Sequence, residues 1–248
     1  ATKWTQSRKE PDENVPGTKP DLAARYAWRY GHAQSVPLPS KVTATELKSL
    51  PEPDPESAEL IERAARPFRM PDLSGAERRL TAAERGTATH LALRYIDLAA
   101  VHSAADAREA INALVYSGRL SEREAGAVDA QSIFALASSE LGARMCAASQ
   151  IWRVFSFSLL RPAGELFAGA RDDEILLQGV VDAAILEDDG ITVIDFKTDR
   201  VSPEQTEARA QNYRGQLETY RDALARIFGK PVKQTVLYFL KPGKEVIL

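Results

Sequence analysis

The sequence has very little cysteine, and this scarcity excludes several kinds of site. Cys146 is the single cysteine among 248 residues. The chain by itself therefore forms neither an intrachain disulfide nor a four-cysteine iron–sulfur cluster. A chain without disulfides is typical of a reducing compartment, so we expect a cytoplasmic protein.

Long apolar runs and a strong net charge are missing as well. No run reaches the roughly 18 apolar residues of a membrane helix, and residues 1–20 lack the apolar core of a secretory signal. We therefore expect no association with a membrane. The formal net charge of -3 argues against a uniformly basic nucleic-acid binder. A local arginine cluster could still contact phosphates, although an ordinary solvated face explains it equally well; its members are Arg63, Arg66, Arg69, Arg78, Arg79 and Arg85.

The most informative stretch that is present is a hairpin with acidic residues in both strands. Residues 176–186 form a largely apolar run, residues 187–190 are rich in Asp and end in Gly, and residues 191–196 are rich in β-branched side chains. This pattern predicts two paired strands joined by a tight turn. Asp182 and Asp195 lie on these strands, and the pairing would bring them together.

Two carboxylates and an ammonium suit a metal-dependent phosphodiesterase. Mg²⁺ prefers hard oxygen ligands, and it polarises a phosphate and lowers the pKa of an attacking water. Lys197 lies two residues after Asp195, so both side chains share one face of a strand. In the alternative interpretation, Asp195 and Lys197 form an exposed ion pair and Asp182 is a polar edge residue. The apolar runs before each Asp count against it, because burying an unpartnered carboxylate is costly.

Two further segments carry candidate site residues. Residues 86–90 are expected to open a helix, which places His90 within its first turns. In a helix expected over residues 211–228, Gln216 and Tyr220 are spaced i,i+4 and share one face. Both segments also have ordinary explanations, since a lone helical His is commonly a surface or core residue and a Gln/Tyr pair can be an interface edge.

The remaining segments predict a proline-punctuated start followed by helices and then a mixture of strands and helices. Residues 1–20 indicate a linker or poorly ordered lead-in, residues 21–30 a helix, and prolines between 37 and 55 a connecting region around a short element at 45–50. Residues 76–150 are expected to be mostly helical, with a capping box at Ser121–Glu124. After this region we expect strands over 151–160 and 165–168, a helix from about 203 to 228, and a sheet strand over 232–240.

Taken in order, these segments resemble the RecB-like nuclease family within the PD-(D/E)xK superfamily. The resemblance is closest to the C-terminal nuclease domains of AddA-type bacterial helicase-nucleases. It rests on an element at the start of the domain, a Gly-Thr-x-x-His motif, a strand before the catalytic hairpin, the hairpin itself and a Gln-x-x-x-Tyr motif. These motifs correspond to residues 39–48, 86–90, 157–160, 178–199 and 213–220. The resemblance predicts a lead-in over residues 1–38 and a nuclease domain over residues 39–248.

The resemblance implies an α/β fold in which a small mixed central sheet is flanked by helices and a helical N-terminal portion supplies His90. It implies a bound Mg²⁺, with Mn²⁺ as a possible substitute. The metal ligands would be His90, Asp182, Asp195 and the carbonyl of Phe196. Lys197 would be the catalytic lysine, and Gln216 and Tyr220 would orient the site or hold substrate phosphate.

One departure from the family pattern lies in residues 153–157. Many relatives carry an acidic residue just before the aromatic residue of this strand, whereas this chain has Arg153-Val154-Phe155-Ser156-Phe157. We therefore assign no catalytic carboxylate to this strand. Glu140 and Glu165 are expected to be solvated surface charges.

The function implied is a metal-dependent deoxyribonuclease, an exonuclease domain that processes double-strand breaks for recombinational repair in the bacterial cytoplasm. The implied partners are DNA, the helicase portion of a longer polypeptide and an AddB-like partner subunit. The chain itself lacks the Gly-x-x-x-x-Gly-Lys-Ser/Thr loop, so we expect it neither to hydrolyse ATP nor to unwind DNA. It would be an excised domain or the tail of a longer chain. The alternatives are a non-catalytic DNA-binding or docking module of this fold and a stand-alone nuclease of the superfamily.

Overall fold

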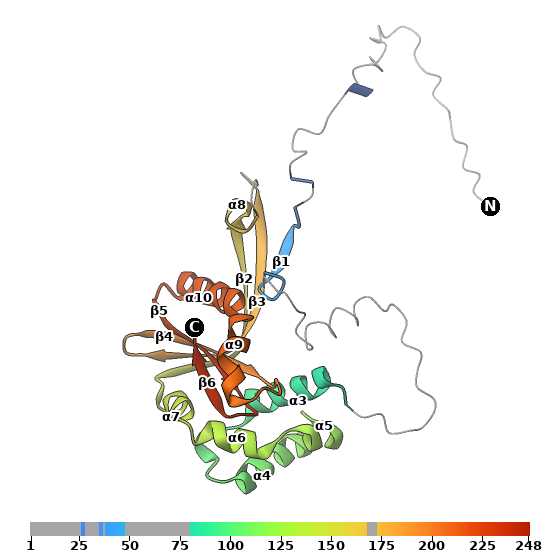
Figure 1. Ribbon diagram of the computed structural model, residues 1–248, viewed down its shortest axis with the longest axis vertical. Helices are drawn as coiled ribbons and strands as arrows, with labels where there is room; N and C mark the ends of the chain where they lie inside the picture. The colour runs from blue at the N-terminus through green and yellow to red at the C-terminus, as the bar shows by residue number, and fades with distance from the viewer. Residues whose placement is uncertain (1–25, 28–34, 37, 48–79, 168–172) are drawn as a thin grey trace, which may run out of the picture. The chain divides into compact units, whose positions relative to one another are not determined.

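The computed structural model describes residues 26–27, 35–36, 38–47, 80–167 and 173–248 (Figure 1). Backbone contacts divide the chain into Ala1–Leu38 and Pro39–Leu248, and every element named below belongs to the second unit. The predicted lead-in and the helix over 21–30 lie almost wholly outside the described residues. So do the end of the 45–50 element and the arginines between 63 and 79. The expectations for these segments stay predictions.

A mixed sheet of six strands forms the centre of the described part of Pro39–Leu248. Its strands are β1 (Lys41–Thr43), β2 (Gln150–Pro162), β3 (Glu174–Glu187), β4 (Gly190–Lys197), β5 (Val232–Phe239) and β6 (Lys244–Ile247). The β3–β4 and β5–β6 pairs are antiparallel, whereas β4 and β5 run parallel. The predicted hairpin, the strand over 151–160 and the late sheet strand are thus confirmed.

Strand β3 changes partner along one of its edges. On the other edge it pairs with β2 over nearly its whole length. On the changing edge it pairs in parallel with β1 at Leu176–Gln178 and then antiparallel with β4 at Ala183–Glu187. Residues 179–182 lie between these two partners, so on this edge their backbone faces a gap among the strands of the described residues.

Helices cover both faces of the sheet. One face, which includes Ile185, Ile194 and Val236, packs against helices from the N-terminal half of Pro39–Leu248. These helices are α3 (Ala82–Tyr95), the 3₁₀ helix η1 (Leu98–Ala100), α4 (Ala104–Tyr116), α5 (Glu122–Ala127), α6 (Ala130–Ala137) and α7 (Glu140–Ala147). On the other face, α10 (Arg214–Phe228) contacts β4 and β5, preceded by α9 (Thr206–Gln211). Each fully buried Leu, Ile or Val contributes roughly 1.5–3 kcal/mol by leaving water. The predicted α/β fold with a mixed sheet between helices is confirmed.

Helix α3 begins earlier than the sequence pattern predicted. The predicted start was at residues 86–90, but the first helical residue is Ala82. Thr81 caps the helix, because its side chain accepts from the Glu84 amide while the Glu84 carboxylate accepts from the Thr81 amide. His90 consequently lies in the middle of α3 rather than in its first turns.

The predictions for two other elements, the strand from residue 165 and the helix over 203–228, were wrong. The segment expected to be a strand from residue 165 begins instead with the short helix α8 (Ala163–Leu166), in which Glu165 pairs with Arg161 of β2. The single helix expected over 203–228 is divided into the 3₁₀ helix η2 (Pro203–Gln205), α9 and α10. The division between α9 and α10 occurs at Asn212 and Tyr213, where the Tyr213 hydroxyl bonds to Asp199 after the end of β4.

Candidate active site

The site forms where β3 and β4 separate. Their last paired residues are Ala183 and Ile194, so Asp182 and Asp195 are the next residues on the two strands. The Phe196 amide donates to the Asp182 carboxylate at 2.8 Å, which replaces the strand-to-strand bonding beyond this point. The separation of the strands therefore gives both carboxylates room at the gap that β3 leaves between β1 and β4.

Helix α3 brings His90 to Asp182. Its Nδ1 lies 3.0 Å from Asp182 Oδ1. Burial alone would raise the pKa of Asp182, but His90, Lys197 and the Phe196 amide outweigh it and hold the pKa below its ordinary value. An ionised carboxylate only accepts, so Nδ1 carries the proton in this bond, and in the neutral imidazole Nε2 keeps the lone pair that a metal ligand needs.

Asp195 and Lys197 form a buried pair. Their residues are 3% and 6% exposed, and Lys197 Nζ lies 3.1 Å from Asp195 Oδ2. Apart from this ion pair, Asp195 Oδ2 is a buried acceptor that receives no hydrogen bond from the described residues. Burial, reinforced by the nearby Asp182, raises the pKa of Asp195. The alternative of an exposed surface ion pair does not fit this burial.

Tyr213 and Asp199 complete the surroundings of Lys197, and the sequence analysis gave neither residue a role. Lys197 Nζ lies 4.3 Å from the centre of the fully buried Tyr213 ring. The Tyr213 hydroxyl donates to Asp199 at 2.9 Å, and Arg209 pairs with the same carboxylate at 2.7 Å. The sequence does contain a signal for both residues. Asp199 continues the two-residue spacing of Asp195 and Lys197, and Tyr213 is the first residue of the segment matched to the Gln-x-x-x-Tyr motif.

Helix α10 presents Gln216 and Tyr220 to the same region. Gln216 Nε2 donates to the Tyr220 hydroxyl at 2.7 Å, and both residues are buried. Burial and the nearby Asp195 carboxylate raise the pKa of Tyr220, so its hydroxyl stays protonated. Gln216 Oε1 is a second buried acceptor that receives no hydrogen bond within the described part of the chain. Gly179 permits this close packing, because a Cβ there would lie 2.5 Å from the Phe157 ring and 3.1 Å from the Tyr220 ring.

Strand β2 is distorted opposite Asp182. The flanking pairs Arg153–Ala183 and Phe155–Val181 place Val154 across from Asp182, and Val154 has φ of 54°. This conformation is strained for a β-branched residue. A small cavity lies here, with His90, Val154 and Asp182 in its lining. The guanidinium of Arg153 donates to the carbonyls of Leu93 and Ile96 at the end of α3, so this residue supports the helix that carries His90.

The donor set suits a hard divalent cation. No three His, Cys, Asp or Glu side chains in the described residues form a ready-made metal cluster. Asp182 is bonded to His90 and Phe196, and Asp195 pairs with Lys197. Mg²⁺, however, commonly uses one or two carboxylates and keeps several waters. The buried acceptor Asp195 Oδ2 fits that requirement. Glu165 pairs instead with Arg161, and Glu140 lies exposed in the first turn of α7.

A central mixed sheet covered by helices on both faces, with an Asp/Asp/Lys group at the separation of two strands, defines a nuclease-type fold and site. Residues 55–247 match the PD-(D/E)XK nuclease superfamily, and the chain belongs to this superfamily. Its curated relatives are ATP-dependent helicase/nuclease subunits of the AddA type. The protein from Alkaliphilus oremlandii is 34% identical over 93% of this chain and 19% of its own length. The protein from Moorella thermoacetica is 36% identical over 91% of this chain and 16% of its own length.

These matches confirm the predicted resemblance. A third relative, from Geobacillus thermodenitrificans, is 34% identical over 86% of this chain and 18% of its own length. The chain therefore spans about a fifth or less of the curated relatives it matches. It is a nuclease domain homologous to part of the AddA-type helicase/nuclease polypeptides. No helix within the described ranges has both the length and the apolar character needed to cross a membrane.

Proposed function

We propose that this chain hydrolyses DNA phosphodiester bonds with Mg²⁺, as the exonuclease domain of a helicase-nuclease. The observation that carries the proposal is the group of half-buried Asp182 and buried Asp195 and Lys197 at the point where β3 and β4 separate, with His90 beside Asp182. A docking module of the same fold gains nothing from two carboxylates facing a phosphate, and burying them carries a cost in stability.

The side chains divide the work of phosphodiester hydrolysis. Asp182, Asp195 and His90 would hold the cation, with the Phe196 carbonyl as a further candidate ligand. When bound, Mg²⁺ would stabilise charge on the phosphate and lower the pKa of an attacking water. Lys197, held against the Tyr213 ring, presents an ammonium for the phosphate or the water. Tyr220 keeps its proton, so with Gln216 it presents polar groups that hold a phosphate oxygen or orient the site.

Substitution of Asp195 tests this assignment against a matched residue. Asp195→Asn removes a metal-binding charge worth several kcal/mol in the transition state, so we expect cleavage of end-labelled DNA to fall by at least about a hundredfold. Asp188→Asn changes an exposed carboxylate in the β3–β4 turn and should leave cleavage unchanged. Both proteins should keep the circular dichroism of the unsubstituted chain. Near-normal activity in folded Asp195→Asn would refute the proposal.

Metal binding and turnover separate the roles of His90 and Lys197. Mn²⁺ affinity, followed by electron paramagnetic resonance, should weaken in His90→Ala because a nitrogen ligand is lost. Lys197→Ala should instead lower kcat and leave Mn²⁺ affinity largely in place. Unchanged Mn²⁺ affinity in His90→Ala would remove His90 from the ligand set. Loss of Mn²⁺ affinity in Lys197→Ala, without a separate fall in kcat, would contradict its role.

The wider setting follows from the names of the relatives. As part of a polypeptide resembling these AddA-type helicase/nucleases, the domain would receive a DNA strand from the helicase portion of the same polypeptide. It would act beside an AddB-like partner during the processing of double-strand breaks. The bacterial cytoplasm is the corresponding compartment.

A further inference from the structure

A cavity with a volume of about 750 Å³ adjoins the candidate active site. Thr89 lines it and directly precedes His90, while Thr198, Asp199 and Arg200 line it and directly follow Lys197. A strand whose scissile phosphate lies at Lys197 would therefore place its neighbouring nucleotide at this cavity. None of the roles given to His90, Asp182, Asp195 or Lys197 accounts for the cavity.

The lining of this cavity is cationic although the chain as a whole is not. It contains four cationic side chains and two carboxylates, namely Arg85, Arg200, Arg209, Lys241, Asp129 and Asp199. The net charge of the whole chain is -3. The positive potential is thus concentrated beside the site, where a local excess of one sign attracts an anionic ligand.

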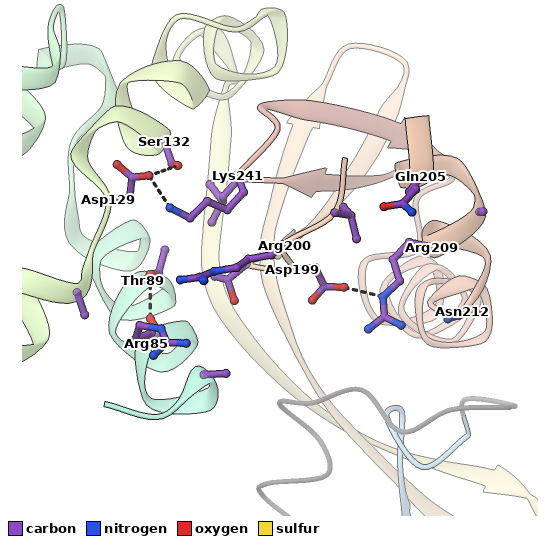
Figure 2. Close-up of a pocket in the computed structure, with 16 residues that line it drawn as sticks. Arg85, Thr89, Asp129, Ser132, Asp199, Arg200, Gln205, Arg209, Asn212 and Lys241 are labelled. Atoms are coloured by element: carbon purple, nitrogen blue, oxygen red, sulfur yellow. Dashed lines mark hydrogen bonds and ion pairs between the residues drawn. The ribbon is translucent and has the colours of Figure 1, made fainter. Parts of the chain in front are cut away.

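Two of these cations have carboxylate partners, and among the described residues the other two have none. Asp199 pairs with Arg209 at 2.7 Å, and Asp129 pairs with Lys241 at 2.8 Å. Arg85 donates to the Leu80 carbonyl and forms no ion pair within the described ranges. Arg200 is exposed, with no hydrogen bond or ion pair to other described residues. In Figure 2, the Arg200 side chain points away from Asp199 and toward the side of the cavity where α3 carries Arg85.

We propose that this cavity binds the sugar-phosphate backbone of the single DNA strand next to the scissile phosphate, with Arg200 and Arg85 as its phosphate contacts. The inference rests on the proposed nuclease function. Both guanidiniums offer planar, paired donors that match phosphate oxygens. No aromatic residue lines the cavity among the described residues, so it lacks a platform for stacking bases. Binding is therefore independent of base sequence.

Binding without cleavage tests this proposal directly. The probe is a fluorescent single-stranded oligodeoxynucleotide, and its anisotropy gives Kd over a series of KCl concentrations in EDTA, where the metal-dependent reaction cannot occur. Arg200→Ala should weaken binding about tenfold, and the slope of log Kd against log salt should fall by about 0.7 for one lost phosphate contact. Arg85→Ala should act in the same direction. Arg200→Lys should keep most of the salt dependence, because the positive charge remains.

Arg221→Ala is the matched control, since Arg221 is exposed on α10 and pairs with Asp222. It should bind like the unsubstituted chain. Equal affinities for Arg200→Ala and Arg221→Ala would overturn the proposal. Weaker binding with an unchanged salt slope, a strong dependence on base sequence, or no binding of single strands would also overturn it.

With Mg²⁺, Arg200→Ala should raise KM for DNA cleavage and leave kcat unchanged. Failure of the unsubstituted chain to cleave would refute the nuclease function and still leave the Kd comparison to decide the cavity's role.

Discussion

Lys197 is held by an ion pair and a ring contact in a place where an unpaired ammonium would be costly. It pairs with Asp195, lies over the Tyr213 ring and has Asp182 nearby. Removing an ion from water costs several kcal/mol, and close opposite charges recover that cost only in good geometry. A position that restricts Lys197 so closely is suited to aiming its charge at a reacting phosphate.

The Tyr213 ring is expected to position Lys197. A desolvated cation–π contact is worth up to about 2 kcal/mol, so Tyr213→Leu should lower kcat roughly tenfold or more, while Mn²⁺ affinity stays unchanged. Tyr213→Phe keeps the ring and loses only the hydroxyl that bonds to Asp199, so it should restore most of the turnover. Single-turnover cleavage and Mn²⁺ titration would measure both effects. Equal losses of kcat in the two variants would show that the hydroxyl, rather than the ring, matters.

Among the elements, α3 depends on β2 for its C-terminal end. Arg153 donates to the carbonyls of Leu93 and Ile96, which are among the last carbonyls of the helix and its cap. Such carbonyls have no partner within the helix and must be satisfied from outside. Arg153 therefore supports the end of the helix that bears His90.

Arg108 provides an internal control for this role. From α4, it donates to the Ala125 and Val128 carbonyls at the end of α5, at 2.9 and 3.0 Å. Arg153→Met and Arg108→Met should each lower the free energy of unfolding by about 1–3 kcal/mol, because each leaves two carbonyls without donors. Urea denaturation measures that loss. Only Arg153→Met should also weaken Mn²⁺ binding and cleavage; an equal effect of Arg108→Met on cleavage would contradict the specific link to His90.

At the scale of the whole nuclease unit, one polar network joins α7 to the sheet. Arg144 of α7 donates to both Glu187 oxygens, to Thr192 Oγ1 and to Gln234 Oε1. Hydrogen bonds to the Glu187 carboxylate, above all from Arg144 and also from Thr192 and Lys233, lower the pKa of Glu187 to about 2 against the opposing effect of burial. The carboxylate form therefore stabilises the folded chain.

The sign of this effect gives a pH prediction. Because the folded pKa of Glu187 is depressed, its contribution is complete above the unfolded value of 4.5 and is lost as the pH falls toward about 2. Glu187→Gln should be less stable than the unsubstituted chain by on the order of 1–3 kcal/mol near neutral pH, and this difference should shrink below about pH 5. Urea denaturation across pH would measure it. A difference that stayed constant with pH would contradict the assignment.

Delivery of DNA is expected to limit the isolated chain. It has no ATP-binding loop and a net charge of -3, so we expect it to bind DNA only through local contacts. A tethered helicase would raise the local concentration of the strand without any new contact. We expect weak cleavage that falls steeply with salt, and faster, less salt-sensitive cleavage in the helicase-linked assembly. Turnover of both across a salt series measures this; equal, salt-insensitive rates would show that no delivery is needed.

Local patterns in the sequence were sufficient for the hairpin, the helical region and the group Asp182, Asp195 and Lys197. Strand alternation places Asp195 and Lys197 on one face whatever the surroundings, and the Asp-rich turn fixes which strands pair. The capping box at Ser121 was equally local and is confirmed. The start of α3 differs from the prediction because Thr81 and Glu84 form a capping box that begins the helix before residue 86.

The tertiary structure alone decided the features that depend on distant partners. Strand β1 has three residues, too few for a periodic signal, and exists through its pairing with β3. The contact of Lys197 with Tyr213, the support of α3 by Arg153 and the cationic cavity all join residues far apart in the chain. The sequence by itself determined which chemistry the chain carries, because that resides in residue types and short spacings. Folding decided which side chains hold that chemistry in place, because long-range packing sets their distances and burial.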